Sequence, residues 1–156
     1  MIIYHLPCKD HVKHYLESAF GIKGKPLSIP AGSSIGKHFY LLIEDASTER
    51  EKKLKLDKYT STLEIKITEH IVLRKGCVLT MTNVRAFNTF VSDHFRNQIH
   101  SMLDVLVEIQ GMDIKKAIEV VYDKYDMDES ILTHEAIRKA YQRHKKTLKS
   151  IINKGT

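Results

Sequence analysis

The period of the hydrophobic positions changes near residue 82 and divides the chain into two differently built parts. Before this point, apolar and polar residues alternate over Thr60–Ile67, which is typical of a half-buried antiparallel strand. After it, apolar residues recur at helical spacing and predict one long helix, capped by Thr82 and ended by Gly111. Its apolar face comprises Val84, Phe87, Val91, Phe95, Ile99, Met102, Leu103, Leu106 and Ile109.

The N-terminal part holds three further predicted elements and a long loop. Ile2–Tyr4 predicts a short strand. Asp10 can cap a helix over His11–Phe20, whose apolar residues share one face. Phe39–Ile43 is a continuous apolar run and predicts a buried strand. Gly21–Lys37, rich in glycine and proline, predicts the loop before that strand.

Three other stretches of this part lack a clear period. Glu44–Lys58 is dense in charged residues, so we expect a solvated connection. Ile71–Leu73 and Cys77–Leu79 are short apolar pieces that flank Gly76, and their pattern does not distinguish strand from helix. A domain boundary, if there is one, is expected near Gly76–Thr82.

The C-terminal part predicts two more helices. Asp113 can cap a helix over Ile114–Tyr125, and Thr133 can cap the last one, over His134–Ile152. The predicted fold class is therefore α+β, with a small antiparallel sheet and one helix followed by a long spine helix and a helical pair. We expect a mixed part over 1–80 and a helical part over 81–156, or one continuous domain.

Composition narrows the class of protein. With 42% hydrophobic and 28% charged residues, the 156-residue chain can bury a core and is not a low-complexity or disordered sequence. Only two cysteines are present, so a disulfide scaffold is excluded and a single bridge is the most that can form. No apolar run has the length of a membrane span, and the first residues lack the basic segment of a signal peptide. We expect a cytoplasmic protein that does not associate with membranes.

The net charge of +6 is concentrated at the end of the chain. Residues 134–156 contain seven bases and one acid, which gives +6, whereas the other 133 residues contain 18 bases and 18 acids. On a helical wheel, Ile137, Ala140 and Tyr141 face one way together with Leu148, Ile151 and Ile152. The opposite face carries the candidate nucleic-acid-binding residues, which are Arg138, Lys139, Gln142, Arg143, Lys145, Lys146 and Lys149.

This pattern favours DNA as the partner. Lysine and arginine neutralise phosphates, while arginine and glutamine can also contact base edges in a major groove. The last two predicted helices resemble a helix-turn-helix pair, with Ile114–Tyr125 as the first helix and Asp126–Leu132 as the turn. The turn is longer than in the standard motif and contains no glycine. RNA is less favoured because no exposed aromatic platform is evident. We expect a non-enzymatic DNA-binding protein, such as a small regulator or an accessory factor of replication or recombination.

Two blander interpretations of the basic helix stay open. Cations near a helix C-terminus interact favourably with the helix dipole, and lysine-rich helices are often plain solvated faces or bind acidic proteins. Alternatively, the protein is a homo-oligomeric interaction module without nucleic acid. A homodimer is favoured if the long apolar helix exceeds what one small domain covers, or if Thr60–Ile67 is an exposed edge strand.

Three motifs give weak evidence for nucleotide or metal binding. Gly32–His38 resembles a phosphate-binding loop, but it is one residue short and a strand is expected after it. Cys8, His11 and His14 can supply three zinc ligands but not a fourth. Asp123–Glu129 lacks the glycine and the closing glutamate of a calcium loop. We therefore expect no metal and no cofactor.

One segment of the long helix suggests an enzyme. Arg96-Asn97-Gln98-Ile99-His100 resembles the Arg-x-x-x-x-His signature of a family of small helical ribonucleases, although it is one residue short. The resemblance implies a histidine acid/base beside an arginine that stabilises the phosphate. The interval from Arg138 to His144 also fits loosely. The sequence contains no nucleophile elbow, which weakens the case for an enzyme without excluding it. A ribonuclease is therefore the third hypothesis.

Overall fold

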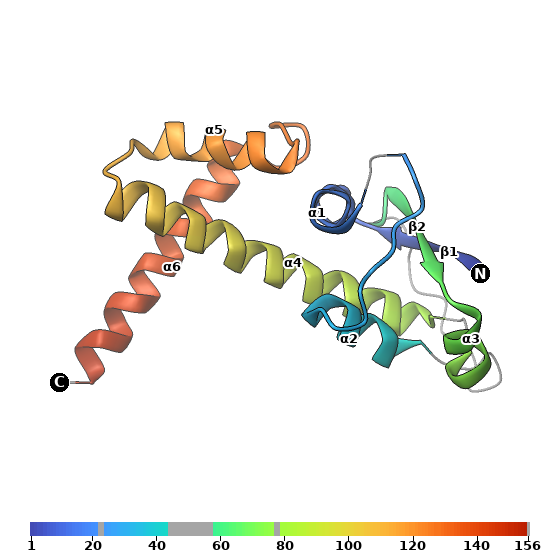
Figure 1. Cartoon of the computed structure of the whole chain (residues 1–156). Helices are drawn as coiled ribbons and strands as arrows, with labels where there is room; N and C mark the ends of the chain where they lie inside the picture. Colours follow the sequence, from blue (N-terminus) through green and yellow to red (C-terminus); the bar gives the residue numbers. More distant parts are fainter. Residues whose placement is uncertain (22–23, 44–57, 77–78, 156) are drawn as a thin grey trace. The chain divides into compact units, whose positions relative to one another are not determined.

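The computed structural model of the protein has an α+β fold, as the sequence predicts. The structure describes residues 1–21, 24–43, 58–76 and 79–155. These residues form two compact units, Met1–Asp93 and His94–Thr156, and the division lies within the long helix α4 (Figure 1). The sequence-based boundary at residues 80 and 81 coincides instead with the beginning of α4, at Met81.

A two-stranded antiparallel sheet lies in the first unit. Strand β1 (Ile2–Cys8) pairs with β2 (Ser61–Ile67), with Ile2 opposite Ile67 and Cys8 opposite Ser61. The alternation predicted for β2 is confirmed, since its three apolar side chains are buried. The second edge of β2 is not free, because Leu27 exchanges backbone hydrogen bonds with Glu64 and Lys66. The expectation of an exposed edge along this strand is therefore wrong at those residues.

Helix α1 (Asp10–Phe20) follows β1 and ends at Gly21, as predicted. Its N-cap is Lys9, so the prediction that Asp10 caps the helix is wrong. The carboxylate of Asp10 instead accepts hydrogen bonds from the hydroxyls of Thr60, at 2.8 Å, and Ser61, at 2.6 Å. These bonds lower the pKa of Asp10, because they stabilise the ionised carboxylate. Asp10 thus joins the helix to β2.

The predicted buried strand at Phe39–Ile43 is wrong, because these residues belong to helix α2 (Ser34–Leu42) and its C-cap. The hydroxyl of Ser33 caps this helix and accepts a hydrogen bond from the Gly36 amide at 2.9 Å. A Cβ on Gly36 would lie 2.0 Å from the carbonyl oxygen of Pro30, so the helix can begin close to the preceding loop only with glycine here. A short apolar run fits either a buried strand or a helix. Here the hydrogen bond from the Gly36 amide to the Ser33 hydroxyl favours the helix.

The first unit also contains helix α3 and the start of the long helix α4. Helix α3 (Glu69–Lys75) contains the ambiguous run Ile71–Leu73, so this unit has more helices than the one predicted before the long helix. Helix α4 (Met81–Leu103) begins two residues after Leu79, and the Thr80 hydroxyl caps it, since it accepts a hydrogen bond from the Asn83 amide at 3.2 Å. The prediction of Thr82 as the cap is therefore wrong. The predicted connection at residues 44–57 and Cys77 lie outside the described residues.

The second unit contains the rest of the long helix and two further helices, α5 and α6. The helical ladder continues from α4 into the π-helical segment η2 (Asp104–Ile109) and stops before Gly111, whose φ is 67°. Asp113 caps α5 (Ile114–Tyr125), as predicted, by accepting a hydrogen bond from the Lys115 amide at 3.0 Å. Helix α6 (His134–Lys154) follows. Buried side chains of the predicted apolar stripe include Phe95, Ile99 and Leu103, but Ile109 is exposed.

Candidate nucleic-acid interface

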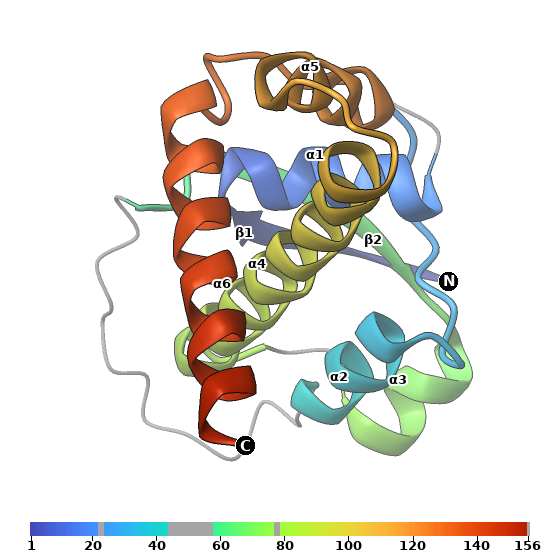
Figure 2. The same ribbon diagram turned by 90° about the vertical axis from the view of Figure 1, so that its left-hand side faces the viewer.

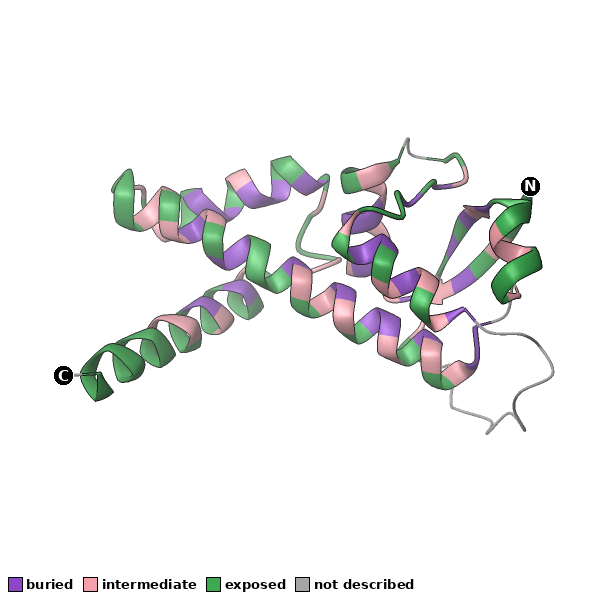
Figure 3. Cartoon of the chain, turned by 60° about the horizontal axis from the view of Figure 1, so that its bottom comes forward, coloured by how far each residue is buried: buried purple, intermediate pink, exposed green. Residues whose placement is uncertain are grey.

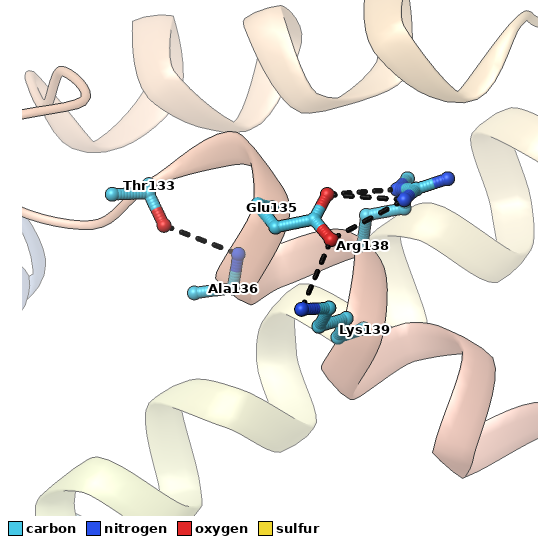
Figure 4. Close-up of polar contacts among 5 residues, drawn as sticks. All are labelled: Thr133, Glu135, Ala136, Arg138 and Lys139. Carbon is cyan, nitrogen blue, oxygen red and sulfur yellow. Dashed lines mark hydrogen bonds and ion pairs between the residues drawn. The ribbon is translucent and has the colours of Figure 1, made fainter.

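Helix α6 begins where the sequence predicts. Thr133 is in an extended conformation, and its hydroxyl accepts a hydrogen bond from the Ala136 amide at 3.1 Å (Figure 4). The hydroxyl of Tyr122 donates to the carbonyl of Leu132 at 2.5 Å, and His134 lies 2.6 Å from a carboxylate oxygen of Glu119. These contacts join the start of α6 to α5.

The middle of α6 is fixed to the long helix by a polar cluster. The hydroxyl of Tyr141 donates to Asp104 at 2.8 Å, and Nε2 of His144 lies 3.3 Å from the other oxygen of that carboxylate. The ring of His100 stacks on that of His144, with 4.5 Å between the centroids. Burial and the neighbouring Asp104 carboxylate raise the pKa of Tyr141, so it stays a protonated donor. The cluster therefore fixes the direction in which the rest of α6 runs.

Three of the seven predicted interface residues are held in ion pairs. Arg138 contacts both carboxylate oxygens of Glu135, at 3.0 to 3.3 Å, and Lys139 contacts the same carboxylate at 3.2 Å (Figure 4). Lys145 pairs with Glu108. Exposed pairs of this kind add little stability, but they cancel part of the positive charge at the start and middle of the helix.

The other four predicted residues are exposed to solvent. Of these, Arg143, Lys146 and Lys149 form no ion pair with any described residue. At about 100° per residue, Lys146 and Lys149 lie within about 40° of Gln142 on the wheel, while Arg143 flanks them at about 100°. We call Gln142, Arg143, Lys146 and Lys149 the unpaired basic face. Its charge is available to an external anion.

The predicted apolar face of α6 is only partly buried. Ile137 and Tyr141 are buried, but the last two turns are exposed on all sides (Figure 3). Leu148, Ile151 and Ile152 are 42%, 62% and 69% exposed. These three side chains share the predicted apolar face with Ile137 and Tyr141 but stay in solvent, because the helix continues past the elements that contact its first half.

The two arginine–histidine pairs of the ribonuclease hypothesis are placed differently. His100 is only 7% exposed, and its Nε2 atom has no hydrogen-bond partner among the described residues. Burial lowers the pKa of His100, and His144 and Arg96 lower it further. In the second pair, the guanidinium of Arg138 is occupied by Glu135. A histidine buried in this way does not reach a phosphate outside the fold.

The suggested metal ligands have other roles. Burial raises the pKa of the Cys8 thiol to about 12, which disfavours the thiolate that zinc requires. His11 forms a hydrogen bond of 2.9 Å with Ser92. Asp128 accepts hydrogen bonds from the amide and hydroxyl of Ser130. Within the described parts of the chain, no three His, Cys, Asp or Glu side chains are grouped to hold a metal ion. Within these parts, too, no helix has the length and hydropathy to cross a membrane.

The acidic partners of the basic helix were not predicted from the sequence. The spacing of three and four residues from Glu135 to Arg138 and Lys139 is a recognisable signal for helix-surface pairs. Asp104 and Glu108 are 37 to 40 residues away from their partners, so no local pattern identifies them.

Comparison of the chain with protein-family models, curated proteins and solved structures found no match.

Proposed function

We propose that this protein binds duplex DNA, without catalysing a reaction, through the unpaired basic face of α6. The observation that supports this proposal is the contrast along one helix: three bases are neutralised within the chain, whereas Arg143, Lys146 and Lys149 are exposed and have no ion pair among the described residues. A surface cation that is already paired gains less from a phosphate than a free one does. The free cations therefore define the contact surface.

The size of this face suits a duplex. Gln142 and Lys149 are seven residues apart on the helix, so they are separated by about 10 Å along its axis. The major groove of DNA is about 12 Å wide and admits an α-helix, whose diameter is about 10 to 12 Å, so a stretch of this length can lie along the groove. Gln142 is the residue of this face that can form two hydrogen bonds with an adenine edge.

The proposed contact differs from that of a standard recognition helix. Such a helix presents its first turns to the bases. Here the first turns of α6 carry the ion pairs of Glu135 and the contact of His134 with Glu119, and the free cations follow in the middle and later turns. We therefore propose contacts dominated by phosphates, with modest sequence preference.

The test is binding to a labelled duplex, measured by fluorescence anisotropy between about 50 and 200 mM salt. Loss of three phosphate contacts in R143A/K146A/K149A should flatten the slope of log K against log salt by about 2.7. R138A/K139A should change the slope less, because these two bases are already paired with Glu135.

The matched control is K25A/K115A/K116A, which removes the same charge from exposed positions outside α6. Equal losses in the two triple variants would mean that only net charge matters and would contradict a site on α6. Absence of binding by the wild type at 50 mM salt would overturn the proposal.

A second function is favoured by a different observation. The exposed Leu148, Ile151 and Ile152 on the last two turns of α6 suit a homo-oligomeric interaction module. Light scattering after size exclusion should then give a mass above the 18.0 kDa of one chain, and I151A/I152A should restore the monomer. A monomeric wild type at high concentration would remove this alternative.

A further inference from the structure

A groove lies between helices α2 and α3 of the first unit, and these two helices lie side by side in Figures 1 and 2. Its volume is about 560 Å³, within the range of about 300 to 1,000 Å³ that is common for small-molecule sites. One part of its wall is basic and consists of Lys37 from α2 with His70, Arg74 and Lys75 from α3. Leu41 and Ile71 supply an apolar part.

Among the residues that the structure describes, the basic wall has no counter-charge. No described Asp or Glu lines the groove, and Lys37 and Arg74 form no ion pair with any described residue. Neighbouring cations repel one another, and nothing in the described fold offsets that repulsion. An anion bound in the groove would offset this repulsion. Arginine in particular can contact a phosphate through two parallel hydrogen bonds.

The groove is built from fixed parts. The ammonium group of Lys75 donates to the backbone carbonyl of Tyr40 at 3.2 Å, which joins the end of α3 to α2. The hydroxyl of Tyr40 donates to the carbonyl of Ile29 at 3.1 Å. Asn83 of α4 donates to the carbonyl of Leu42 at 2.9 Å and holds the end of α2. The two helices therefore present their side chains from anchored backbones.

The apolar wall limits the kinds of anion that fit. Leu41 is 72% exposed, although it directly adjoins the cations of the groove. Inorganic phosphate would neutralise the cations but leave this apolar surface in water. A neutral apolar molecule would cover Leu41 and Ile71 but displace water from the cations without replacing it. A ligand with several negative charges and a flat aromatic ring satisfies both walls, because the faces of such a ring can pack on apolar side chains.

We propose that this groove binds an organic polyphosphate, with a nucleoside triphosphate as the representative ligand. The phosphates contact Lys37 and Arg74, and the base lies on Leu41 and Ile71. The site is separate from the phosphate-loop motif considered at Gly32–His38, with which it shares only Lys37. Only binding is proposed, and no bond forms or breaks. This inference concerns the first unit and does not depend on DNA binding by α6.

The test is a titration of the full chain with a fluorescently labelled nucleoside triphosphate, followed by anisotropy. Binding with one ligand per chain is expected. K37A/R74A should weaken it by about tenfold or more, because two charge-assisted contacts are lost. The control K25A/K58A removes the same charge from exposed positions of the same unit and should leave the affinity within about twofold. Circular dichroism of all three proteins checks that they are folded.

Competition separates the two parts of the ligand. Inorganic triphosphate should displace the probe more weakly than the unlabelled nucleoside triphosphate, and the nucleoside alone should displace it weakest. Several outcomes overturn the proposal: no binding at 1 mM ligand, equal weakening by K37A/R74A and K25A/K58A, or equal competition by inorganic and nucleoside triphosphate. So does binding of anionic phospholipid vesicles that depends on Lys37 and Arg74 when no nucleotide binds.

Discussion

Asn88 is a buried amide that connects the first strand to the long helix. Its Oδ1 atom accepts a hydrogen bond from the Lys9 amide at 3.1 Å, and its Nδ2 atom donates to the carbonyls of Pro7, at 3.0 Å, and Val84, at 2.9 Å. The amide thus satisfies backbone groups at the end of β1 that the partner strand leaves free. These hydrogen bonds explain why a polar residue lies on the apolar face of the helix, and the sequence pattern alone does not reveal them.

Replacement of Asn88 by alanine should lower the free energy of unfolding by about 2 to 4 kcal/mol, because two backbone groups lose their partners. Urea denaturation measures this change. Asn97→Ala is the matched control on the same helix, since Asn97 is exposed, and its effect should stay within about 0.5 kcal/mol. Similar values for the two variants would contradict the structural role of Asn88.

At the scale of elements, α6 changes character along its length. Its first half is docked through Ile137 and Tyr141, whereas its last two turns expose apolar and basic side chains alike. Helical propensity and the Thr133 cap support the exposed part, but packing within the described chain does not. The same helix therefore contains an anchor and a free surface.

This division predicts unequal costs for similar substitutions. Ile137→Ala should reduce the free energy of unfolding by about 2 to 4 kcal/mol, because it opens a cavity in the core. I151A/I152A should change it by less than about 0.5 kcal/mol, because both side chains are already in water. Thermal or urea denaturation at two protein concentrations measures both. A concentration-dependent loss in I151A/I152A would show that a second copy covers these turns.

At the scale of the whole molecule, two histidines, the half-buried His38 and the buried His100, link stability to pH. Burial lowers the pKa of His38 in the first unit, and burial with neighbouring charges lowers that of His100 in the second. His38 stacks on Phe90 and, like His100, has an Nε2 atom without a hydrogen-bond partner in the described structure. Each is therefore neutral in the fold at a pH where the unfolded chain already binds a proton.

The sign follows from proton uptake. Between the ordinary histidine pKa of about 6.5 and the lower values in the fold, the unfolded state binds more protons, so stability falls as the pH is lowered through this window. The slope contributed by each histidine is at most about 1.4 kcal/mol per pH unit. Urea denaturation from pH 7.5 to 5.5 should show a shallower decline for H38Q/H100Q than for the wild type. Equal declines would contradict this account.

Much of the helical plan is local and was predictable. Asp113 and Thr133 stand before amphipathic runs and cap α5 and α6 as expected. The alternation of β2 and its buried face also follow from the sequence. Local signals failed where they were ambiguous: Phe39–Ile43 fits a buried strand as well as a helix, and the Ser33 cap decides for the helix.

For the candidate site, the sequence by itself determined that the last helix is amphipathic, begins after Thr133 and concentrates the net positive charge, because periodicity, capping and charge are properties of neighbouring residues. Only the tertiary structure decided which charges are free. Asp104 and Glu108 are about 40 residues away from α6 in the sequence but contact it in the fold, so Lys145 is paired with Glu108. Lys146 and Lys149 stay exposed, because α6 continues past the elements that contact its first half. The groove between α2 and α3 likewise exists only once the fold brings Lys37 and Arg74 to one wall, since burial and pairing depend on distances that spacing in the chain does not encode.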